Sequence, residues 1–349
     1  MTFDRRTFLK TGSLALAGLS LKPSLLAGFG QNAFPPEFKS NRPPVDERNF
    51  VSEAVEATIA ENKKRINHPE LRWMFENCFP NTLDTTIQHG TFKGELDTFI
   101  ITGDIPAMWL RDSTAQVWPY LPLINEDEKL KKLVQGAINR QTRCVLIDPY
   151  ANAFNYDDSP EENPWQDDLT EMKPELHERK WEIDSLCYVV RLAHGYWKQT
   201  GDASLFNRRW DRAMKLILKT FREQQRKDNR GPYRFQRRTT RWIDTLPLNG
   251  YGNPTKKVGL IHSMFRPSDD CCIYPFLVPS NLMAVKELKN LEEIYEAEMR
   301  DKSFIDECRF IRGEVSEAIE EYAIVDFKDY GKIYAYEVDG FGNKLFMDD

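Results

Sequence analysis

Pairs of amphipathic helical segments recur along this 349-residue chain, and they constrain its fold more than any other feature. Apolar residues return at helical spacing over 51–65 and 68–78, 113–124 and 127–146, 184–200 and 203–225, and 279–300 and 303–324. A helix with one apolar stripe must bury that stripe against another element. The pattern therefore predicts a mainly helical α/α toroid, in which the connections on one face form a pocket.

The predicted ring is expected to be incomplete. About eight helical segments are recognisable, whereas a closed double ring of six pairs needs about twelve. The sequence also stops inside an acidic stretch, FMDD. We expect that the C-terminal part of the domain is missing. Thr98, Phe99, Ile100 and Ile101 form a candidate strand, and residues 332–347 a candidate hairpin.

Composition excludes several classes of protein. A hydrophobic content of 41% and an aromatic content of 12% fit a folded globular protein. The net charge is −6 and no basic block alternates with aromatic residues, so nucleic acid is not an expected partner. The most basic run, residues 237–241, is expected to be a solvated loop or strand edge. The six cysteines lack zinc-site spacing and are expected in the core, with at most one disulfide.

The amino terminus resembles a twin-arginine export signal. Arg5 and Arg6 precede a mildly apolar run rich in Gly and Ala, which is too short and weak to span a membrane. We expect residues 1–31 to be this signal, 32–46 a linker rich in Pro and Asn, and 47–349 the folded domain. The expected location is the periplasm, reached through the twin-arginine machinery, with no stable membrane span. The alternative is a chance Arg-Arg pair before an amphipathic helix.

Four segments combine acids with aromatic rings, and three of them add an arginine. They are GDIPAMWLRDST, ERKWEIDS, FRPSDD and YAYEVDGF, beginning at residues 103, 178, 265 and 334. Aromatic faces stack on the C–H face of a sugar, acids and arginines bind its hydroxyls, and a carboxyl pair can cleave a glycosidic bond. One such cluster alone would more often hold a helix end in place. Four of them predict a carbohydrate site on the connecting loops.

These motifs make the sequence resemble glycoside hydrolase family 125, the inverting exo-α-1,6-mannosidases. Long blocks carry the resemblance from about Phe50 to the last residue: GDIPAMWLRDSTAQVWPYL, ERKWEIDSLCYVVRLAHGYW, FRPSDDCCIYPFLVPSNLMAV and YAYEVDGFGNKLFMDD. The resemblance implies an (α/α)6 barrel of the six-hairpin glycosidase type over residues 47–349. It also implies release of terminal mannose with inversion from a mannose-containing glycan, without a metal or cofactor.

The catalytic carboxyls are only partly assigned by this resemblance. An inverting hydrolase needs a protonated carboxyl and a carboxylate that activates water, roughly 6.5–9.5 Å apart. Motif order places the general acid at Asp269 or Asp270, and a like-charged neighbour would raise the pKa of one of them. Ser268 is also a candidate N-cap for a following helix, so one aspartate could serve the helix start. The family's general base is a Glu beyond the last residue and is expected to be absent.

The other motif residues are expected to bind sugar: Asp104, Trp109, Arg111, Asp112, Glu182, Asp184, Arg266, Tyr336 and Glu337. Two alternatives remain beside an active mannosidase. One is a catalytically inactive mannoside-binding remnant, because the base is expected to be missing. The other is a different enzyme on an α/α toroid, either a glucosidase or a polysaccharide lyase. A lyase needs a basic groove for uronates, which this acidic chain does not show.

Overall fold

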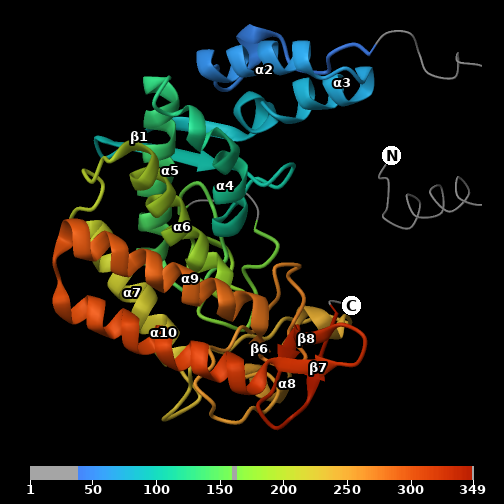
Figure 1. Ribbon diagram of the computed structural model, residues 1–349, viewed down its shortest axis with the longest axis vertical. Coiled ribbons are helices and arrows are strands. Elements are labelled where there is room, and N and C mark those ends of the chain that lie inside the picture. Colours follow the sequence, from blue (N-terminus) through green and yellow to red (C-terminus); the bar gives the residue numbers. More distant parts are fainter. Residues whose placement is uncertain (1–37, 159–162, 348–349) are drawn as a thin grey trace, which may run out of the picture.

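The computed structural model describes residues 38–158 and 163–347, and the predicted export signal lies outside them. The described chain is mainly helical, as predicted (Figure 1). Helices α2 and α3 lie at one end of the molecule, helices α4 to α7 with α9 and α10 form its body, and short strands of the C-terminal segment lie at the other end (Figure 1). Among the described residues, no helix is both long and apolar enough to cross a membrane.

The N-terminal elements are two helices that pack on each other and a β-hairpin that packs on helix α5. Their bounds are α2 (Glu53–Arg65), α3 (Pro69–Cys78), β1 (Ile87–Phe92) and β2 (Glu95–Ile100). The two strands form a hairpin whose two turn residues, Lys93 and Gly94, both have positive φ. Strand β2 contains most of the predicted strand and packs on α5 (Glu128–Ile147). Gly136 of α5 allows this contact, because a Cβ there would lie 2.3 Å from Thr98 Oγ1.

Helix pairs make up the body, and their ends follow local capping signals. The helices are α4 (Leu110–Val117), α6 (Ile183–Thr200), α7 (Arg208–Gln224), α8 (Pro247–Gly250), α9 (Val278–Ile294) and α10 (Lys302–Tyr322). Helix α6 packs on both α4 and α9, α9 packs on α10, and α5 packs on α7. Gly201 ends α6 in the left-handed conformation, as its sequence position predicts. Helix α7 begins at Arg208, after the Asn207 cap, and not at residue 203 as expected.

Two small antiparallel sheets each contain a strand that runs directly into a helix. One has the order β3-β4-β5, with β3 (Met108–Trp109), β4 (Ala153–Phe154) and β5 (Leu176–Glu178). Strand β3 runs directly into α4, and β5 ends five residues before α6 begins. The other sheet has the order β10-β9-β6, with β6 (Phe276–Leu277), β9 (Glu337–Val338) and β10 (Lys344–Leu345). Strands β9 and β10 form the hairpin predicted near the C-terminus, and β7 (Ile324–Phe327) pairs with β8 (Gly331–Tyr334).

Three further observations bear on the sequence-based expectations. The FRPSDD segment does not begin a helix, because α9 starts only at Val278 with Leu277 as its N-cap residue. All six cysteines are free, and Cys78 is exposed while the other five are buried. Part of the predicted linker packs on the domain, since the Arg42 guanidinium binds the carboxylates of both Asp84 and Glu56.

Candidate functional site

Arg111 lies at the centre of a cluster of carboxylates. Its Nη1 lies 2.7 Å from Glu182 Oε2 and 3.4 Å from Asp184 Oδ2, and its Nε lies 3.6 Å from Asp112 Oδ2. Arg111 and Asp112 belong to the first turn of α4, whereas Glu182 and Asp184 lie at the start of α6. Because α4 packs on α6, the two motifs meet at these helix starts. The partial positive charge of a helix N-terminus favours carboxylates there.

Asp269 joins this cluster from a tight turn. Arg266 N–H donates to the Asp270 carbonyl at 2.8 Å, and Phe265 pairs with Cys271, so Pro267, Ser268 and Asp269 form a three-residue hairpin loop. Asp269 has a φ of 66°, which is the left-handed conformation that commonly closes such a loop. Ser268 therefore lies in this turn. The alternative expectation, that Ser268 caps a helix, is wrong.

The contacts of Asp269 tie it to Asn152 and to two residues of the ERKWEIDS motif. Asn152 Nδ2 donates to Asp269 Oδ1 at 3.2 Å, and Lys180 Nζ donates to the Asp269 carbonyl oxygen at 2.7 Å. The Asp269 carboxyl also lies within hydrogen-bonding reach of Glu182. Two carboxyls in such contact share a proton more readily than they both ionise.

Burial and mutual repulsion raise the pKa of three acids in the cluster. Desolvation is the largest cause for Asp269, and the charge of Glu178 adds to it. Desolvation also raises the pKa of Glu182 well above its usual range, with further contributions from Asp184 and Asp269, and it raises the pKa of Asp184. The Arg111 charge opposes each of these shifts. The cluster is thus arranged to hold a proton close to Asp269 and Glu182.

Several buried polar atoms of this cluster have no hydrogen-bond partner in the described part of the chain. They are Trp109 Nε1, Asp112 Oδ2, Glu182 Oε1 and Asp184 Oδ1, although Asp112 Oδ2 keeps its 3.6 Å ion-pair contact with Arg111 Nε. Buried polar groups are normally paired, and leaving one unpaired costs about 1–3 kcal/mol. A concentration of unpaired donors and acceptors around one arginine is what a site for a polyhydroxylated ligand requires.

A second layer of charged residues supports Asp269. Asn152 Nδ2 also donates to Glu178 Oε2 at 2.9 Å, and Lys180 Nζ lies 3.4 Å from Glu178 Oε1. Arg237 Nη2 lies 2.9 Å from the same Glu178 oxygen. The buried Glu178 carboxylate is therefore held by two cations and an amide, and it lies close enough to Asp269 to raise the pKa of that residue.

Arg237 is the clearest functional residue that the sequence did not reveal. The basic run 237–241 is a loop, as expected, and residues 239–241 are exposed, but the Arg237 side chain is only 7% exposed. Its guanidinium lies 3.7 Å from the ring centroid of Trp165 and binds Asp168 in a two-pronged ion pair. Trp165 and Asp168 are 72 and 69 residues away in sequence, so no local pattern could indicate them. His177, whose ring packs edge-on against Trp109 at 5.4 Å, was missed for the same reason.

Not every predicted site residue joins the cluster. Asp104 is exposed in the turn before β3. Arg266 Nε binds Glu337 Oε1 at 2.7 Å, and Glu337 Oε2 accepts from the backbone N–H groups of Ile273 and Tyr274. The Arg266 guanidinium lies 5.6 Å from the Tyr336 ring centroid. These residues fix the base of the hairpin loop that carries Asp269 and Asp270, and the side chains of Arg266 and Glu337 are buried.

The sequence and the fold both match known proteins. The family model for metal-independent alpha-mannosidases, GH125, matches residues 68–349. A Streptococcus pneumoniae metal-independent alpha-mannosidase, solved as a non-productive complex with alpha-1,6-mannobiose, is 41% identical with a TM-score of 0.80. That match covers 86% of this chain and 70% of the solved one. The meiotically up-regulated gene 157 protein of Schizosaccharomyces pombe is 38% identical over 327 residues, 88% of this chain.

The chain spans 64% of the length of that Schizosaccharomyces pombe protein. Within the described residues, no group of three or more His, Cys, Asp or Glu side chains could hold a metal ion. The family match covers most of the chain, including all the residues of the Arg111 cluster. The chain is a member of the GH125 family of metal-independent alpha-mannosidases.

Proposed function

We propose that this protein hydrolyses α-linked mannosides and releases a terminal mannose from an α-1,6 linkage with inversion. The observation that carries the proposal is the Arg111 cluster, with its unpaired polar atoms and its proton-holding carboxyls. The α-1,6-mannobiose bound by the solved relative makes this linkage the first to test. Sugar hydroxyls would supply the missing partners of Asp112, Asp184 and Trp109.

We infer that Asp269 is the general acid. A general acid must keep its proton until the leaving oxygen takes it, and both burial and Glu178 raise the pKa of Asp269. Asn152 and Lys180 fix the turn that presents its carboxyl. Asp270 follows in the same hairpin, where its carbonyl accepts from Arg266. The proposal thus assigns the proton transfer to the first aspartate of the pair.

Glu182, Glu337 and Asp339 are not placed to act as the general base. Glu182 contacts Asp269, whereas the two carboxyls of an inverting enzyme lie about 6.5–9.5 Å apart to leave room for water. Both oxygens of Glu337 are occupied by Arg266 and backbone N–H groups. Asp339 accepts from Phe341 and from both nitrogens of Asn343, which fixes the β9–β10 turn. This observation favours a second candidate function, mannoside binding without turnover by these 349 residues.

The remaining features of the proposal concern architecture and location. We propose that the stacked helices belong to an (α/α)6 toroid, a view supported by the successive packing of α4, α6, α9 and α10. We also propose export through the twin-arginine route, supported by Arg5 and Arg6 in the sequence. Replacing both arginines with lysine should retain the protein in the cytoplasm, which cell fractionation measures. Unchanged export of this variant would contradict the proposal.

Proton NMR of α-1,6-mannobiose hydrolysis tests the function directly. Inversion requires β-mannose as the first-formed product, at a rate that EDTA does not change. Asp269→Asn should lower the rate by about 10²–10⁴, and Asp270→Asn serves as its matched control. An aryl mannoside with a good leaving group should suffer much less in Asp269→Asn, because its departure needs little protonation. Binding of mannobiose without any product would support the second candidate function, and equal losses in the two variants would contradict the assignment of the acid.

A further inference from the structure

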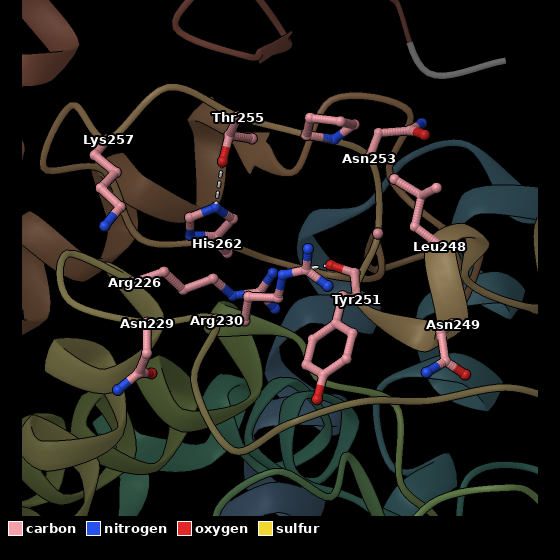
Figure 2. A pocket seen from close by; sticks show the side chains of 12 residues that line it. Arg226, Asn229, Arg230, Leu248, Asn249, Tyr251, Asn253, Thr255, Lys257 and His262 are labelled. Carbon is pink, nitrogen blue, oxygen red and sulfur yellow. Dashed lines mark hydrogen bonds between the residues drawn. The ribbon is translucent and has the colours of Figure 1, made fainter.

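A cavity of about 590 Å³ lies apart from the Arg111 cluster (Figure 2). Its lining comes from the segment after α7, from α8 and from residues 251–262. Three lining residues are cationic, namely Arg226, Arg230 and Lys257, and no lining residue in the described chain is acidic. Figure 2 shows these side chains around one space with His262. The cavity is therefore strongly positive, although the whole chain carries a net charge of −6.

Arg226 is positioned by neutral groups only. Its Nε donates to Gln224 Oε1 at 3.1 Å, its Nη1 donates to the Tyr251 carbonyl at 2.8 Å, and its Nη2 lies 3.3 Å from Met264 Sδ. No carboxylate of the described chain pairs with it, in contrast to Arg111 and Arg237. Burial without a counterion lowers the pKa of Arg226 to about 10, so the guanidinium stays charged at neutral pH. Neutral acceptors orient the guanidinium but leave its charge uncompensated.

The groups around Arg226 do not supply the missing negative charge. His262 lies 2.6 Å from the Gln224 carbonyl through Nδ1 and 2.7 Å from Thr255 Oγ1 through Nε2. Burial and the Arg226 charge lower the pKa of His262 to about 3, which keeps the ring neutral. The guanidinium of Arg230 lies over the Tyr251 ring, 5.4 Å from its centroid. Lys257 donates to the carbonyl of Lys227, which is again a neutral partner.

The backbone at the rim of the cavity is strained. Leu248 and Asn249 in α8 have φ values of 52° and 61°, and both line the cavity with exposed side chains. Two consecutive non-glycine residues in the left-handed region are costly, and such strain collects at ligand sites. Asn229, Asn253 and Thr255 add neutral hydrogen-bonding groups to the lining.

We propose that this cavity binds a phosphate group, either as the free anion or as the monoester of a sugar. A phosphate carries about −1.5 to −2 charges at pH 7 and offers three strong acceptor oxygens. It matches a cluster of one partly buried arginine, a second arginine and a lysine, because a guanidinium binds two phosphate oxygens at once. The volume lies within the range of about 300–1,000 Å³ of small-molecule sites, so a phosphate with an attached sugar fits.

The cavity is separate from the Arg111 cluster, and contacts through Met264 and Trp181 lie between the two sites. Arg226 contacts Met264, and the backbone N–H of Met264 donates to the carbonyl of Trp181 at 3.1 Å. Trp181 immediately precedes Glu182. The anion site depends on its own charges and volume, and it does not depend on the proposed hydrolysis.

Calorimetric titration of the full 349-residue chain at constant ionic strength tests the site with three probes. These are inorganic phosphate, mannose 6-phosphate and mannose. We expect inorganic phosphate and mannose 6-phosphate to bind in the cavity. Titration with mannose should give the same affinity for the cavity variants as for the wild type. Arg230→Gln with Lys257→Gln should weaken phosphate binding at least tenfold while the circular dichroism spectrum stays unchanged, because both side chains are exposed.

The matched control is Arg208→Gln with Lys289→Gln, which removes the same charge from two exposed positions outside the cavity. This control should bind phosphate as the wild type does. Tighter binding of mannose 6-phosphate than of inorganic phosphate would identify a sugar monoester as the ligand, and equal affinities would identify the free anion. Absence of phosphate binding, or equal weakening in the control and the cavity variant, would overturn the proposal.

Discussion

Replacement of Arg111 by Met should destabilise the protein in a pH-dependent way. Met has a similar length and no charge, so the change removes the cation that faces Glu182 and Asp184. The side chains of these acids are 0% and 4% exposed, and water cannot replace the lost partner. At an effective dielectric constant of about 20, the 2.7 Å and 3.4 Å contacts correspond to attractions of about 6 and about 5 kcal/mol.

The measurable loss should be smaller than these attractions, because the acids escape ionisation by taking up protons. Breaking a buried ion pair from one side typically costs about 3–5 kcal/mol, and we expect this range at pH 8. The pKa values of Glu182 and Asp184 are already raised in the folded state and rise further without Arg111. A raised carboxyl pKa lowers stability as pH increases from the unfolded value towards the folded one. The loss at pH 5 should therefore be smaller by at least about 1.4 kcal/mol, one pKa unit.

Urea unfolding at pH 5 and pH 8 measures both quantities. Arg241→Met is the matched control, because its side chain is 67% exposed and its pair with Asp244 at 3.6 Å should contribute less than about 1 kcal/mol. Adding Glu182→Gln and Asp184→Asn to Arg111→Met should restore most of the lost stability. A loss below about 1 kcal/mol for Arg111→Met that is equal at both pH values would refute the view of the cluster as a buried, proton-holding site.

Two further changes test the support around the site. Glu178→Gln should lower the pKa of Asp269, because the Glu178 charge raises it, and the alkaline limb of the pH–rate profile should therefore move to lower pH. The control Glu126→Gln changes an exposed residue and should leave the limb in place. An unmoved limb in Glu178→Gln would disprove the coupling between Glu178 and Asp269. Gly136→Ala should cost about 1–3 kcal/mol in urea unfolding, because the new Cβ would collide with Thr98; an unchanged unfolding midpoint would show that the strand moves freely.

Local sequence patterns predicted most helices, because the residues that end a helix and the apolar residues of its buried face lie close together in sequence. The cap at Gly201 and the apolar spacing of α5, α6 and α10 follow from residues within one or two turns. The start of α7 was misplaced because Asp202 resembles a cap, although its carboxylate accepts from the Tyr196 hydroxyl and the Ser204 backbone instead. The alternative that Ser268 caps a helix failed for a related reason, since Ser268 has the chemistry of a cap but lies in a hairpin turn.

The candidate site was predictable in its centre and not in its surroundings. Arg111, Asp112, Glu182, Asp184 and Asp269 lie in motifs whose mixture of acids and arginine pointed to one site, and the structure brings them together. The supporting residues were not predictable, because their roles come from contacts across the fold. Glu337 shows the converse case, in which a motif acid is used to hold the backbone of a neighbouring loop.

Binding of α-1,6-mannobiose to the cluster is the measurement that tests the central claim most directly. Isothermal titration does not require turnover, so it separates the sugar site from the question of the base. The wild type should bind the disaccharide, and Asp112→Ala should weaken binding at least tenfold without loss of folded structure, because Asp112 Oδ2 accepts no hydrogen bond from the described chain and has only a 3.6 Å contact with Arg111. Asp326→Ala, at an exposed position on β7, should bind normally. Equal affinity of Asp112→Ala and the wild type would contradict the assignment of the Arg111 cluster as the mannoside site.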